Sequence, residues 1–459
     1  MPDEILIIGG GFAGLTAGVA LAQAGRRVRL LEQKPHLGGR ASSFLDPATG
    51  SVVDNGQHLF MGCYHQTIEF LKTIGTLDRV RFQSGLSVKF LDSGGSLSAL
   101  VCPRLPAPWH LLVGVLRSGS FKWSEKLEVL RIRAALSRRG DSNDGNRNLT
   151  VDQWLKGLGQ SENLRQYFWN LICIAAMNED PRIASAALFE RVLKLALFSS
   201  ANDSRLGIAR VGLSDCYTTA AAEFISAHGG RVELGQNVTG LLVSDGGCQG
   251  VTLAGGERVQ AQTVLSAAPW NKFTSLLPGD LLRNEPFFTK ILSLRPAPII
   301  SINLWFDRPV TNLEFVGLRG TTIQWLFNKS RILDERGRES AASALRTSAP
   351  HRSYISLVLS GAHEHIGRSK EDLLAMAMGE LQGLMPEAKQ AKLVHSLIVK
   401  ERFATFSPCV GVEDLRPTAA TPVRGLYLAG DWTATGLPAT IEGAVKSGYT
   451  AAGEILQTT

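Results

Sequence analysis

The chain opens on an apolar strand pattern that runs directly into a glycine-rich turn and a helix pattern. Residues 5–8 (ILII) are all apolar, which is typical of a buried parallel strand. Residues 15–24 are rich in helix-forming residues, and Gly25 stands where such a helix would stop. A second apolar run at 28–31 predicts the next strand. The chain is therefore predicted to begin with a strand–helix–strand unit.

Further along, the pattern of apolar and polar positions changes several times. Between about 75 and 213, two short strand patterns are followed by mainly helical ones. A helix and several strands alternate from 213 to 268, and residues 286–394 combine strands with one long helical stretch. The chain closes on an apolar strand that runs into Gly430 and Asp431, with a helix of small residues after it.

These patterns predict an α/β protein of two domains, each built from stretches that are far apart in the sequence. A chain of 459 residues is long enough for two or more hydrophobic cores, because single cores stop growing at roughly 250–300 residues. The predicted nucleotide-binding domain comprises residues 1–75, 213–275 and 395–459. The predicted substrate domain comprises residues 76–212 and 276–394.

The turn after the first strand carries the candidate chemistry, because its sequence is G-x-G-x-x-G. In such a turn Gly9 permits the tight bend, Gly11 lets a diphosphate approach the backbone, and Gly14 lets helix and strand pack closely. Free N–H groups at the helix N-terminus favour the charge of a diphosphate. Glu32, at the end of the second strand, can accept hydrogen bonds from ribose hydroxyls and would repel a 2′-phosphate. We therefore expect one dinucleotide other than NADP, since no second turn of this kind follows a strand.

Composition and charge narrow the range of functions. The net charge of +7 is modest and does not argue for nucleic acid as a partner. The 6 cysteines include no C-x-x-C pair, so we expect neither a disulfide framework nor a metal site. No charge-free apolar run approaches the roughly 18 residues of a membrane span. The first strand begins by Ile5, so we expect no signal peptide and a cytoplasmic location.

Two polar turns after Glu32 are further candidates for ligand contact. The first, Gly38-Gly39-Arg40, places an arginine where it could neutralise a diphosphate, although a solvated turn has the same composition. The second follows a short strand pattern, and Gly56 within it can bring the backbone close to a ligand. His58 is the candidate proton donor in this motif, with a purely structural histidine as the alternative. Asp54 is expected to cap a turn, and Glu442 to complement the dipole of the helix that it begins.

The nucleotide-binding start, together with the Gly-Asp turn near the C-terminus, resembles the two-domain FAD oxidoreductases, the superfamily of amine oxidases, protoporphyrinogen oxidase and phytoene desaturases. The resemblance implies a Rossmann-like FAD domain and a substrate domain of a mixed sheet plus helices. It implies that Glu32 holds the adenosine ribose and that Val238 meets the adenine through its backbone. Its other implied FAD contacts are Gly39 and Arg40 near the diphosphate, Gly430 and Asp431 at the ribitol or diphosphate, and the helix start near Ile441 at the flavin pyrimidine.

Within this superfamily the chain is most similar to the squalene-associated desaturase-like proteins, the hydroxysqualene dehydroxylases of bacterial hopanoid pathways. The matching stretches are 52–64, 266–278, 322–332 and 426–448. The resemblance implies that reduced FAD removes the hydroxyl of hydroxysqualene, with electrons from a separate, unidentified donor. A carotenoid-type desaturase or a non-catalytic flavin-binding carrier is the alternative. A flavin amine oxidase is disfavoured by Thr440, where those enzymes place an aromatic residue.

The implied substrate is a long-chain isoprenoid that is nearly insoluble in water, so such an enzyme must collect it from a membrane or a partner. Residues 105–139 combine an apolar run at 111–116 with an excess of Lys and Arg, which suits an anionic bilayer surface. A solvated helix that covers the substrate domain is the alternative. We expect peripheral attachment to the inner face of the cytoplasmic membrane through this segment.

Overall fold

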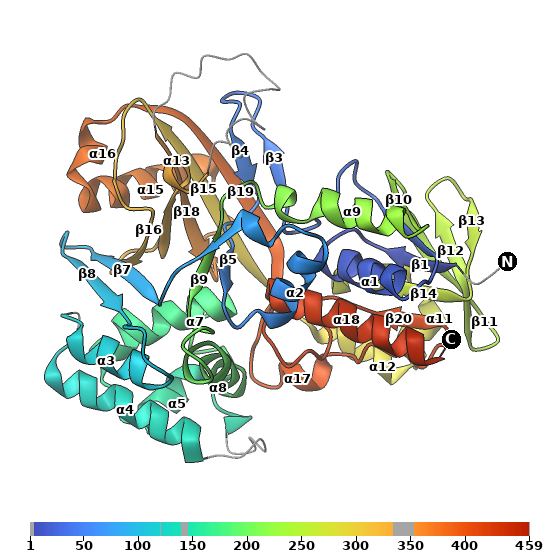
Figure 1. Cartoon of the computed structure of the whole chain (residues 1–459), viewed down its shortest axis with the longest axis horizontal. Helices are drawn as coiled ribbons and strands as arrows, with labels where there is room; N and C mark the ends of the chain where they lie inside the picture. Colours follow the sequence, from blue (N-terminus) through green and yellow to red (C-terminus); the bar gives the residue numbers. More distant parts are fainter. Residues whose placement is uncertain (1–3, 120, 139–145, 334–352, 459) are drawn as a thin grey trace.

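The computed structural model describes residues 4–119, 121–138, 146–333 and 353–458, which form two lobes around two large sheets (Figure 1). The first sheet has five parallel strands in the order β10-β2-β1-β14-β20. Its strands are β1 (Ile5–Ile8), β2 (Val28–Glu32), β10 (Arg231–Leu234), β14 (Thr263–Ser266) and β20 (Leu426–Leu428). All four residues of β1 are buried, as expected for a central parallel strand.

Three helices pack together beside this sheet (Figure 1). They are α1 (Phe12–Gln23), α9 (Thr218–Ala227) and α18 (Ile441–Thr458), so the expected strand–helix–strand unit is confirmed at the start of the chain. An antiparallel sheet of β11 (Val238–Ser244), β12 (Gly247–Leu253) and β13 (Arg258–Gln260) adjoins them. The nucleotide-binding lobe is therefore assembled from the start, the middle and the end of the chain.

The second sheet has seven strands in the order β19-β15-β18-β17-β16-β7-β8. Neighbouring strands are antiparallel except β16 and β7, which are parallel, so the sheet is mixed as expected. Its strands are β7 (Ser87–Asp92), β8 (Leu97–Val101), β15 (Pro296–Phe306), β16 (Phe315–Arg319), β17 (Trp325–Asn328), β18 (Ser353–Ser360) and β19 (Leu393–Phe406). The sequence-based boundary at residue 395 falls inside β19, because pairing with β15 holds that strand in this sheet.

Side chains of the second sheet alternate between two environments. Ile300, Leu326 and Leu357 point to one face, where they share a core with the long helix α15 (Lys370–Leu384). Their neighbours Ile299 and Val358 point to the other face and line a cavity. Successive side chains of a strand point to opposite faces, so this sheet is both a packed core and a cavity wall.

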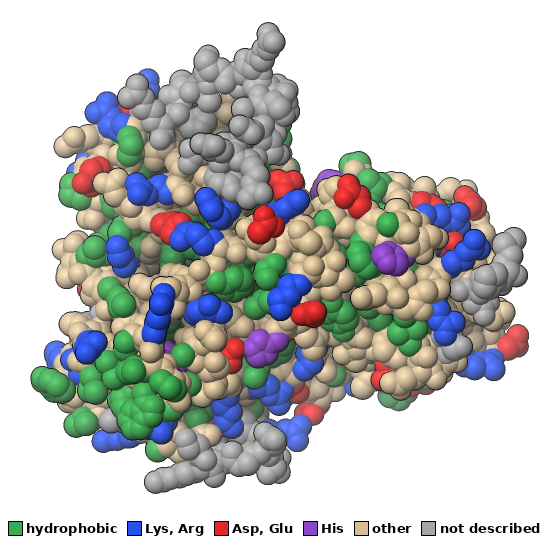
Figure 2. Space-filling view, in the orientation of Figure 1, with side chains coloured by type: hydrophobic (Ala, Val, Ile, Leu, Met, Phe, Trp, Pro, Cys, Tyr) green, Lys and Arg blue, Asp and Glu red, His purple; other side chains and the backbone are tan. Residues whose placement is uncertain are grey.

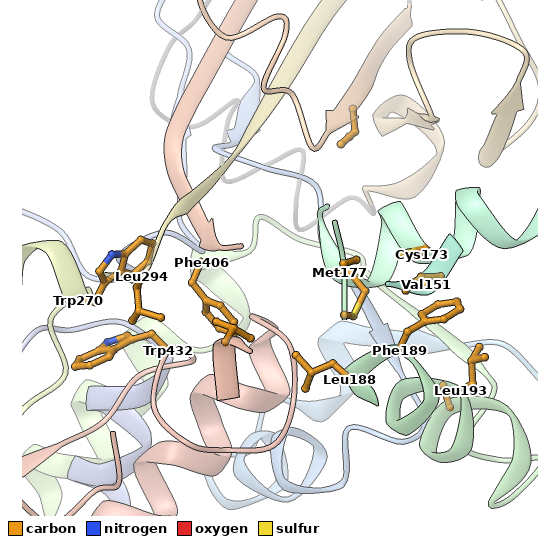
Figure 3. Close-up of a cluster of buried hydrophobic side chains, with 14 of the residues drawn as sticks. Val151, Cys173, Met177, Leu188, Phe189, Leu193, Trp270, Leu294, Phe406 and Trp432 are labelled. Atoms are coloured by element: carbon orange, nitrogen blue, oxygen red, sulfur yellow. The ribbon is translucent and has the colours of Figure 1, made fainter. Parts of the chain in front are cut away.

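Helices between β8 and β9 lie below the second sheet in Figure 1 and close the cavity on that side. Apolar side chains of these helices continue into the core of the nucleotide-binding lobe, and Figure 3 shows this from Val151 and Phe189 across to Phe406 and Trp432. The helical elements are α3 (Trp109–Arg117), α4 (Trp123–Arg138), α5 (Val151–Gly157), α6 (Glu162–Leu164), η3 (Arg165–Trp169), α7 (Asn170–Met177), α8 (Ala186–Leu193) and η4 (Lys194–Phe198).

Two small sheets connect the lobes: β3 (Ser43–Leu45) with β4 (Val52–Asp54), and β5 (Leu59–Met61) with β9 (Leu206–Ala209) and β6 (Val80–Phe82). The remaining elements are α2 (His65–Thr73), η1 (Leu77–Arg79), η5 (Ser214–Cys216), α10 (Trp270–Leu276), α11 (Gly279–Asn284), α12 (Pro286–Thr289), η6 (Lys290–Ser293), α13 (Lys329–Ile332), α16 (Pro386–Gln390) and α17 (Val412–Leu415).

Candidate functional site

A large cavity between the lobes brings the predicted site residues together. Its volume is about 1160 Å³, and it runs from the glycine-rich turn after β1 to the wall formed by α3, α7 and α8. The predicted site residues that line it are Gly9, Gly11, Glu32, Gly39, Arg40, Gly56, His58, Val238, Gly430, Asp431 and Ile441. Gly14 is the exception, because it packs beneath the turn instead of facing the cavity.

The glycine-rich turn forms one end of the cavity. Gly9 has φ +103°, a left-handed conformation that favours glycine. A Cβ on Gly14 would lie 2.0 Å from the Gly9 carbonyl oxygen, so the helix can approach the strand only without a side chain there. A Cβ on Gly11 would make only ordinary contacts, with Gly39 at 3.9 Å and Gly38 at 4.0 Å, and Gly11 lines the cavity, so a longer side chain would extend into it. Gly11 is also the N-cap of α1 and makes no side-chain cap, which leaves the helix N–H groups for a diphosphate.

The Glu32 carboxylate is held at the end of β2 by backbone donors. Its Oε2 accepts a hydrogen bond from the Gly10 N–H at 2.7 Å, and its Oε1 accepts one from the Lys34 N–H at 2.9 Å. The side chain is only 5% exposed and lines the cavity. The carboxylate oxygens therefore have a fixed orientation beside the glycine turn, as the contact with a ribose hydroxyl requires.

A stacked pair of aromatic rings packs beside the two glycine-rich turns, the one after β1 and the one at Gly38-Gly39. The rings of Phe12 and Tyr217 stack with centroids 3.7 Å apart, and the Tyr217 hydroxyl donates to the Gly38 carbonyl at 2.9 Å. Both residues are fully or nearly buried. Sequence reasoning missed this support because the residues are about 200 positions apart along the chain, and a tyrosine in a helix start gives no signal of such a contact.

Arg40 and Asp431 lie against each other at the cavity wall. The Arg40 guanidinium forms an ion pair with the Asp431 carboxylate, and its Nη1 also donates to the Ala404 carbonyl of β19 at 2.8 Å. The two residues were expected to make separate contacts with the cofactor. The structure joins them, because Gly430, with φ +143°, turns the chain after β20 toward the loop that carries Arg40.

Arg416 organises the turn that carries Asp431, a role that the sequence did not reveal. Its Nη2 donates to the Asp431 carbonyl at 2.9 Å and to the Thr435 hydroxyl at 2.7 Å, and its Nη1 donates to the Leu437 carbonyl at 2.8 Å. The side chain of Arg416 is fully buried. A buried guanidinium with this many backbone partners fixes the path of the chain from β20 to α18.

Glu442 lies in the first turn of α18, as expected, and also has a second role. Its carboxylate accepts hydrogen bonds from the backbone N–H groups of Gln66 at 3.0 Å and Thr67 at 2.9 Å. These are free donors in the first turn of α2, so Glu442 caps that helix and not only its own. The contact places α2 beside the N-terminus of α18, where Ile441 and Thr440 line the cavity.

His58 lies at the point where the polar and apolar parts of the cavity meet. Its Nδ1 is 2.8 Å from the Gly56 carbonyl, and since a carbonyl only accepts, Nδ1 carries the proton. Burial lowers the pKa of His58 below its usual 6.5, against the raising effect of the Gly56 carbonyl. The neutral ring then has its lone pair at Nε2, so His58 can donate a proton from Nε2 only after it has been protonated.

A buried ion pair, Asp54–Lys329, lines the same small cavity as His58. The Lys329 ammonium donates to the Asp54 carboxylate at 2.7 Å, and their side chains are only 3% and 7% exposed. Asp54 also accepts from the Ser43 hydroxyl and the Leu213 N–H. With His58 and Gln57 this pair lines a small cavity of about 10 Å³, which is the size of one water molecule. Asp54 thus joins two segments of the chain instead of capping a turn, and Lys329 was missed by sequence reasoning.

The far part of the large cavity is an apolar chamber. Phe90, Trp325 and Phe327 line it from the seven-stranded sheet, and Phe168 and Leu171 line it from the helices. The structure places Phe168 at the chamber and Trp169 in the core, where its indole N–H donates to the Gln160 side chain. Such a chamber suits a long hydrocarbon chain.

FAD fits the polar end of this cavity on three observations. Gly11 lines the groove without a side chain that would fill it, the N-terminus of α1 has no side-chain cap, and Glu32 lines the same groove. The fold and the groove together define an FAD-dependent oxidoreductase. Among the described residues, no group of three or more His, Cys, Asp or Glu side chains could hold a metal ion.

Comparison with known proteins gives the same class. Residues 12–456 match the family described as flavin containing amine oxidoreductase, so the chain belongs to this family. The chain is 30% identical to hydroxysqualene dehydroxylase of Rhodopseudomonas palustris, with 99% of both chains covered. It is 27% identical to 15-cis-phytoene desaturase of Solanum lycopersicum, over 99% of this chain and 78% of that protein.

Solved structures with the same fold include an oxidoreductase from Methanosarcina mazei, with a TM-score of 0.73 and 16% identity over 99% of this chain and 100% of the other. A putrescine oxidase bound to putrescine has a TM-score of 0.69 and 15% identity over 100% and 99% of the two chains. The predicted two-domain FAD oxidoreductase fold is confirmed, and so is FAD as the cofactor.

Replacing Gly11 and Gly14 separately by Val should separate binding from folding. The Gly11→Val protein should fold but bind no FAD, because the new side chain occupies the diphosphate groove. The Gly14→Val protein should lose about 1–3 kcal/mol of stability or fail to fold, because its Cβ meets the Gly9 carbonyl. Flavin absorbance of the two variants as purified measures binding, and chemical denaturation of their apoproteins measures stability. Normal FAD content in Gly11→Val would contradict this assignment of the groove.

Replacing Lys329 by Met should cost about 3–5 kcal/mol, because it leaves the Asp54 carboxylate buried without its charged partner. Lys370→Met, at an exposed lysine of α15, should change stability by less than about 0.5 kcal/mol. Chemical denaturation of both variants measures this contrast.

The Asp54–Lys329 pair should also make the free energy of unfolding depend on pH. Burial alone would raise the pKa of Asp54, but Lys329 and the hydrogen bonds outweigh it and hold the pKa below the usual 3.8. The contribution of Asp54 to stability is therefore present above 3.8 and is lost as the pH falls through the lowered value. In Lys329→Met the buried Asp54 carboxylate has no charged partner, so its pKa should be raised and its protonation should relieve the unpaired charge. The stability that Lys329→Met loses relative to the wild type should therefore shrink as the pH falls in an acid titration. A difference in stability that does not change with pH would mean that the pair does not control Asp54.

Proposed function

We propose that this protein removes the hydroxyl of hydroxysqualene to give squalene and water. The observation that carries the proposal is an apolar chamber whose wall turns polar at His58, beside the groove that fits FAD. A long hydrocarbon chain fits the chamber, and the polar corner offers the proton that a leaving hydroxyl needs. The relative from Rhodopseudomonas palustris, similar over its full length, supports the same reaction.

The proposed reaction balances as a two-electron reduction of the substrate. When bound in its reduced form, FAD supplies a hydride to the carbon that loses the hydroxyl. The residues of this chain contribute a proton to the departing oxygen and keep the reacting carbon in a chamber of low polarity. His58 is the candidate donor, and a water molecule in the small cavity beside Asp54, Gln57 and Lys329 is the alternative. The electrons come from a separate donor that reduces the FAD.

Phytoene-type desaturation is the second candidate, because the plant desaturases are similar over almost the whole chain. A desaturase takes a hydride from one carbon and releases a proton from the next, and the neutral His58 could accept that proton at Nε2. The polar cluster beside the chamber can therefore serve either reaction, and the preference for dehydroxylation rests on the 30% identity to the Rhodopseudomonas palustris protein over 99% of both chains. Oxidation of amines is less well supported, because Thr440, Leu437 and Pro438 stand at the cavity wall near the start of α18, with no aromatic side chain among these three.

Anaerobic incubation of the reduced holoenzyme tests the direction of the reaction. Hydroxysqualene should restore the absorbance of oxidised flavin and yield one squalene for each flavin, whereas phytoene should have no effect. Three controls use the oxidised enzyme with phytoene, with putrescine and without substrate. Bleaching of the flavin by phytoene, with no reoxidation by hydroxysqualene, would establish the desaturase instead. Bleaching by putrescine would establish an amine oxidase.

The rate of flavin reoxidation by hydroxysqualene should rise as the pH falls toward the lowered pKa of His58, because only the protonated ring can donate from Nε2. His58→Ala should slow this step by about 10²–10⁴-fold and flatten the pH profile, with FAD content unchanged. His228→Ala, at an exposed histidine after α9, is the matched control and should behave as the wild type. Unchanged kinetics in His58→Ala would leave the water molecule as the proton donor.

A further inference from the structure

Large apolar side chains are exposed together on the helices that close the chamber. Trp123 is 73% exposed and Leu127 is 62% exposed, one turn apart on α4. Trp109 at the start of α3 is 53% exposed, and Leu105 just before it is 38% exposed. Figure 2 shows hydrophobic side chains gathered over the region of α3 and α4, with Lys and Arg side chains around them. We call Leu105, Trp109, Trp123 and Leu127 the α3–α4 patch.

The structure divides the apolar residues of the segment 105–139, through which attachment to a membrane was predicted. Leu111 and Val115 are 5% and 2% exposed and belong to the protein core, whereas Leu112, Val113 and Leu116 are half-buried. Helix α3 packs Leu111 and Val115 inward, whereas Trp109 on the same helix stays 53% exposed. Aromatic side chains with a polar edge are typical of the boundary between a bilayer and water.

The charges around the patch are arranged for an anionic surface. Lys122 and Arg131 are exposed, and the Arg133 guanidinium lies 5.6 Å from the centre of the Trp109 ring. Lys126 is buried instead, and its ammonium donates to the Leu116 carbonyl at 2.7 Å. Residue 139 and the side chain of Arg138 lie outside the described part of the chain.

The acids of the same helix point away from the patch. The Glu125 carboxylate accepts from the Lys122 N–H and the Asn163 side chain, and that of Glu128 accepts from the Ser161 N–H. The outer face of α4 is therefore basic as well as apolar, a combination that fits phospholipid headgroups.

The patch and the chamber are two sides of one wall. Leu111, two residues after Trp109 on α3, lines the large cavity, and so does Leu100 of β8, next to the exposed Val101. Helix α3 thus separates the apolar chamber from the exposed surface by the thickness of a single helix. No helix within the described ranges is long and apolar enough to cross a membrane, so contact through this patch would be at the bilayer surface.

We propose that the α3–α4 patch binds the surface of an anionic phospholipid bilayer and holds the chamber wall against the membrane, so that a membrane-dissolved isoprenoid can pass into the chamber beside α3. The proposal rests on the proposed function for the identity of the substrate, but binding of the patch to lipid does not depend on it. An anionic bilayer is favoured over a second copy of the chain because basic groups flank the patch while its acids are turned inward.

Flotation of the holoenzyme with vesicles tests the surface directly. The wild type should bind vesicles of phosphatidylcholine and phosphatidylglycerol, bind phosphatidylcholine vesicles weakly, and lose binding as salt is added. Trp123→Ser with Leu127→Ser should weaken binding by at least about tenfold, because the apolar anchors are lost. Leu292→Ser with Leu234→Ser, at exposed leucines elsewhere, should bind as the wild type does. Flavin content and thermal unfolding verify that each variant is folded.

Charge reversal gives an independent variant should the first one misfold. Lys122→Glu with Arg131→Glu should reduce binding to the anionic vesicles, whereas Lys370→Glu with Lys389→Glu, at exposed lysines near α15, should not. Equal binding by all variants, or no binding by the wild type, would overturn the proposal. A concentration-dependent dimer that disappears in Trp123→Ser with Leu127→Ser would identify the patch as an interface between two copies and would also overturn it.

Activity measurements separate this proposal from the proposed function. The patch variants should reoxidise reduced flavin with detergent-solubilised hydroxysqualene at the wild-type rate, but several-fold more slowly when the substrate is embedded in vesicles. A wild type that binds vesicles but reacts with hydroxysqualene in neither form would refute the reaction and leave the surface assignment intact. Equal loss of activity with both substrate forms would contradict a role of the patch in substrate uptake.

Discussion

The fold depends on the close packing of α1 (Phe12–Gln23), which has neighbours on every side. Side chains are missing where the backbones meet: a Cβ on Gly14 would lie 2.0 Å from the Gly9 oxygen, and one on Gly448 would lie 2.4 Å from the Ala13 oxygen. Gly448 lets α18, from the end of the chain, pack against α1, and Gly18, where a Cβ would lie 2.8 Å from Ile225 Cδ1, does the same for α9 from the middle of the chain. The same packing directs the N-terminus of α1 at the cavity, so the constraint that builds the core also builds the diphosphate site.

Buried and half-buried ion pairs connect the polar end of the cavity to the surrounding chain. The Arg40–Asp431 pair joins the glycine turn at 38–39 to the turn before α18, and the Asp54–Lys329 pair joins β4 to α13, directly after β17. Charges in such surroundings need their partners, because an unpaired buried charge is costly. Each pair therefore ties together two segments that carry site residues, and the geometry of the groove depends on both.

The seven-stranded sheet explains how one lobe can hold both a core and a chamber. Along β15, β17 and β18, side chains alternately join the core with α15 on one face of the sheet and line the cavity on the other face. The chamber is closed on the other side by helices whose outer surface is not covered by the described chain. An apolar chamber behind an apolar, basic surface is a consistent arrangement for a substrate that dissolves in membranes and not in water.

The sequence by itself determined the glycine turn, the acidic end of β2, the parallel sheet and the class of cofactor, because these follow from residues that are close together in the chain or from motifs in a set order. It did not reveal which distant residues meet. Arg40 pairs with Asp431 across 391 positions, Glu442 caps α2 across 376, and Lys329 reaches Asp54 across 275. Nor did it reveal which apolar residues of α3 are exposed. Tertiary packing decides both matters, since the partner of a buried charge and the free face of a helix depend on what the rest of the chain brings beside it.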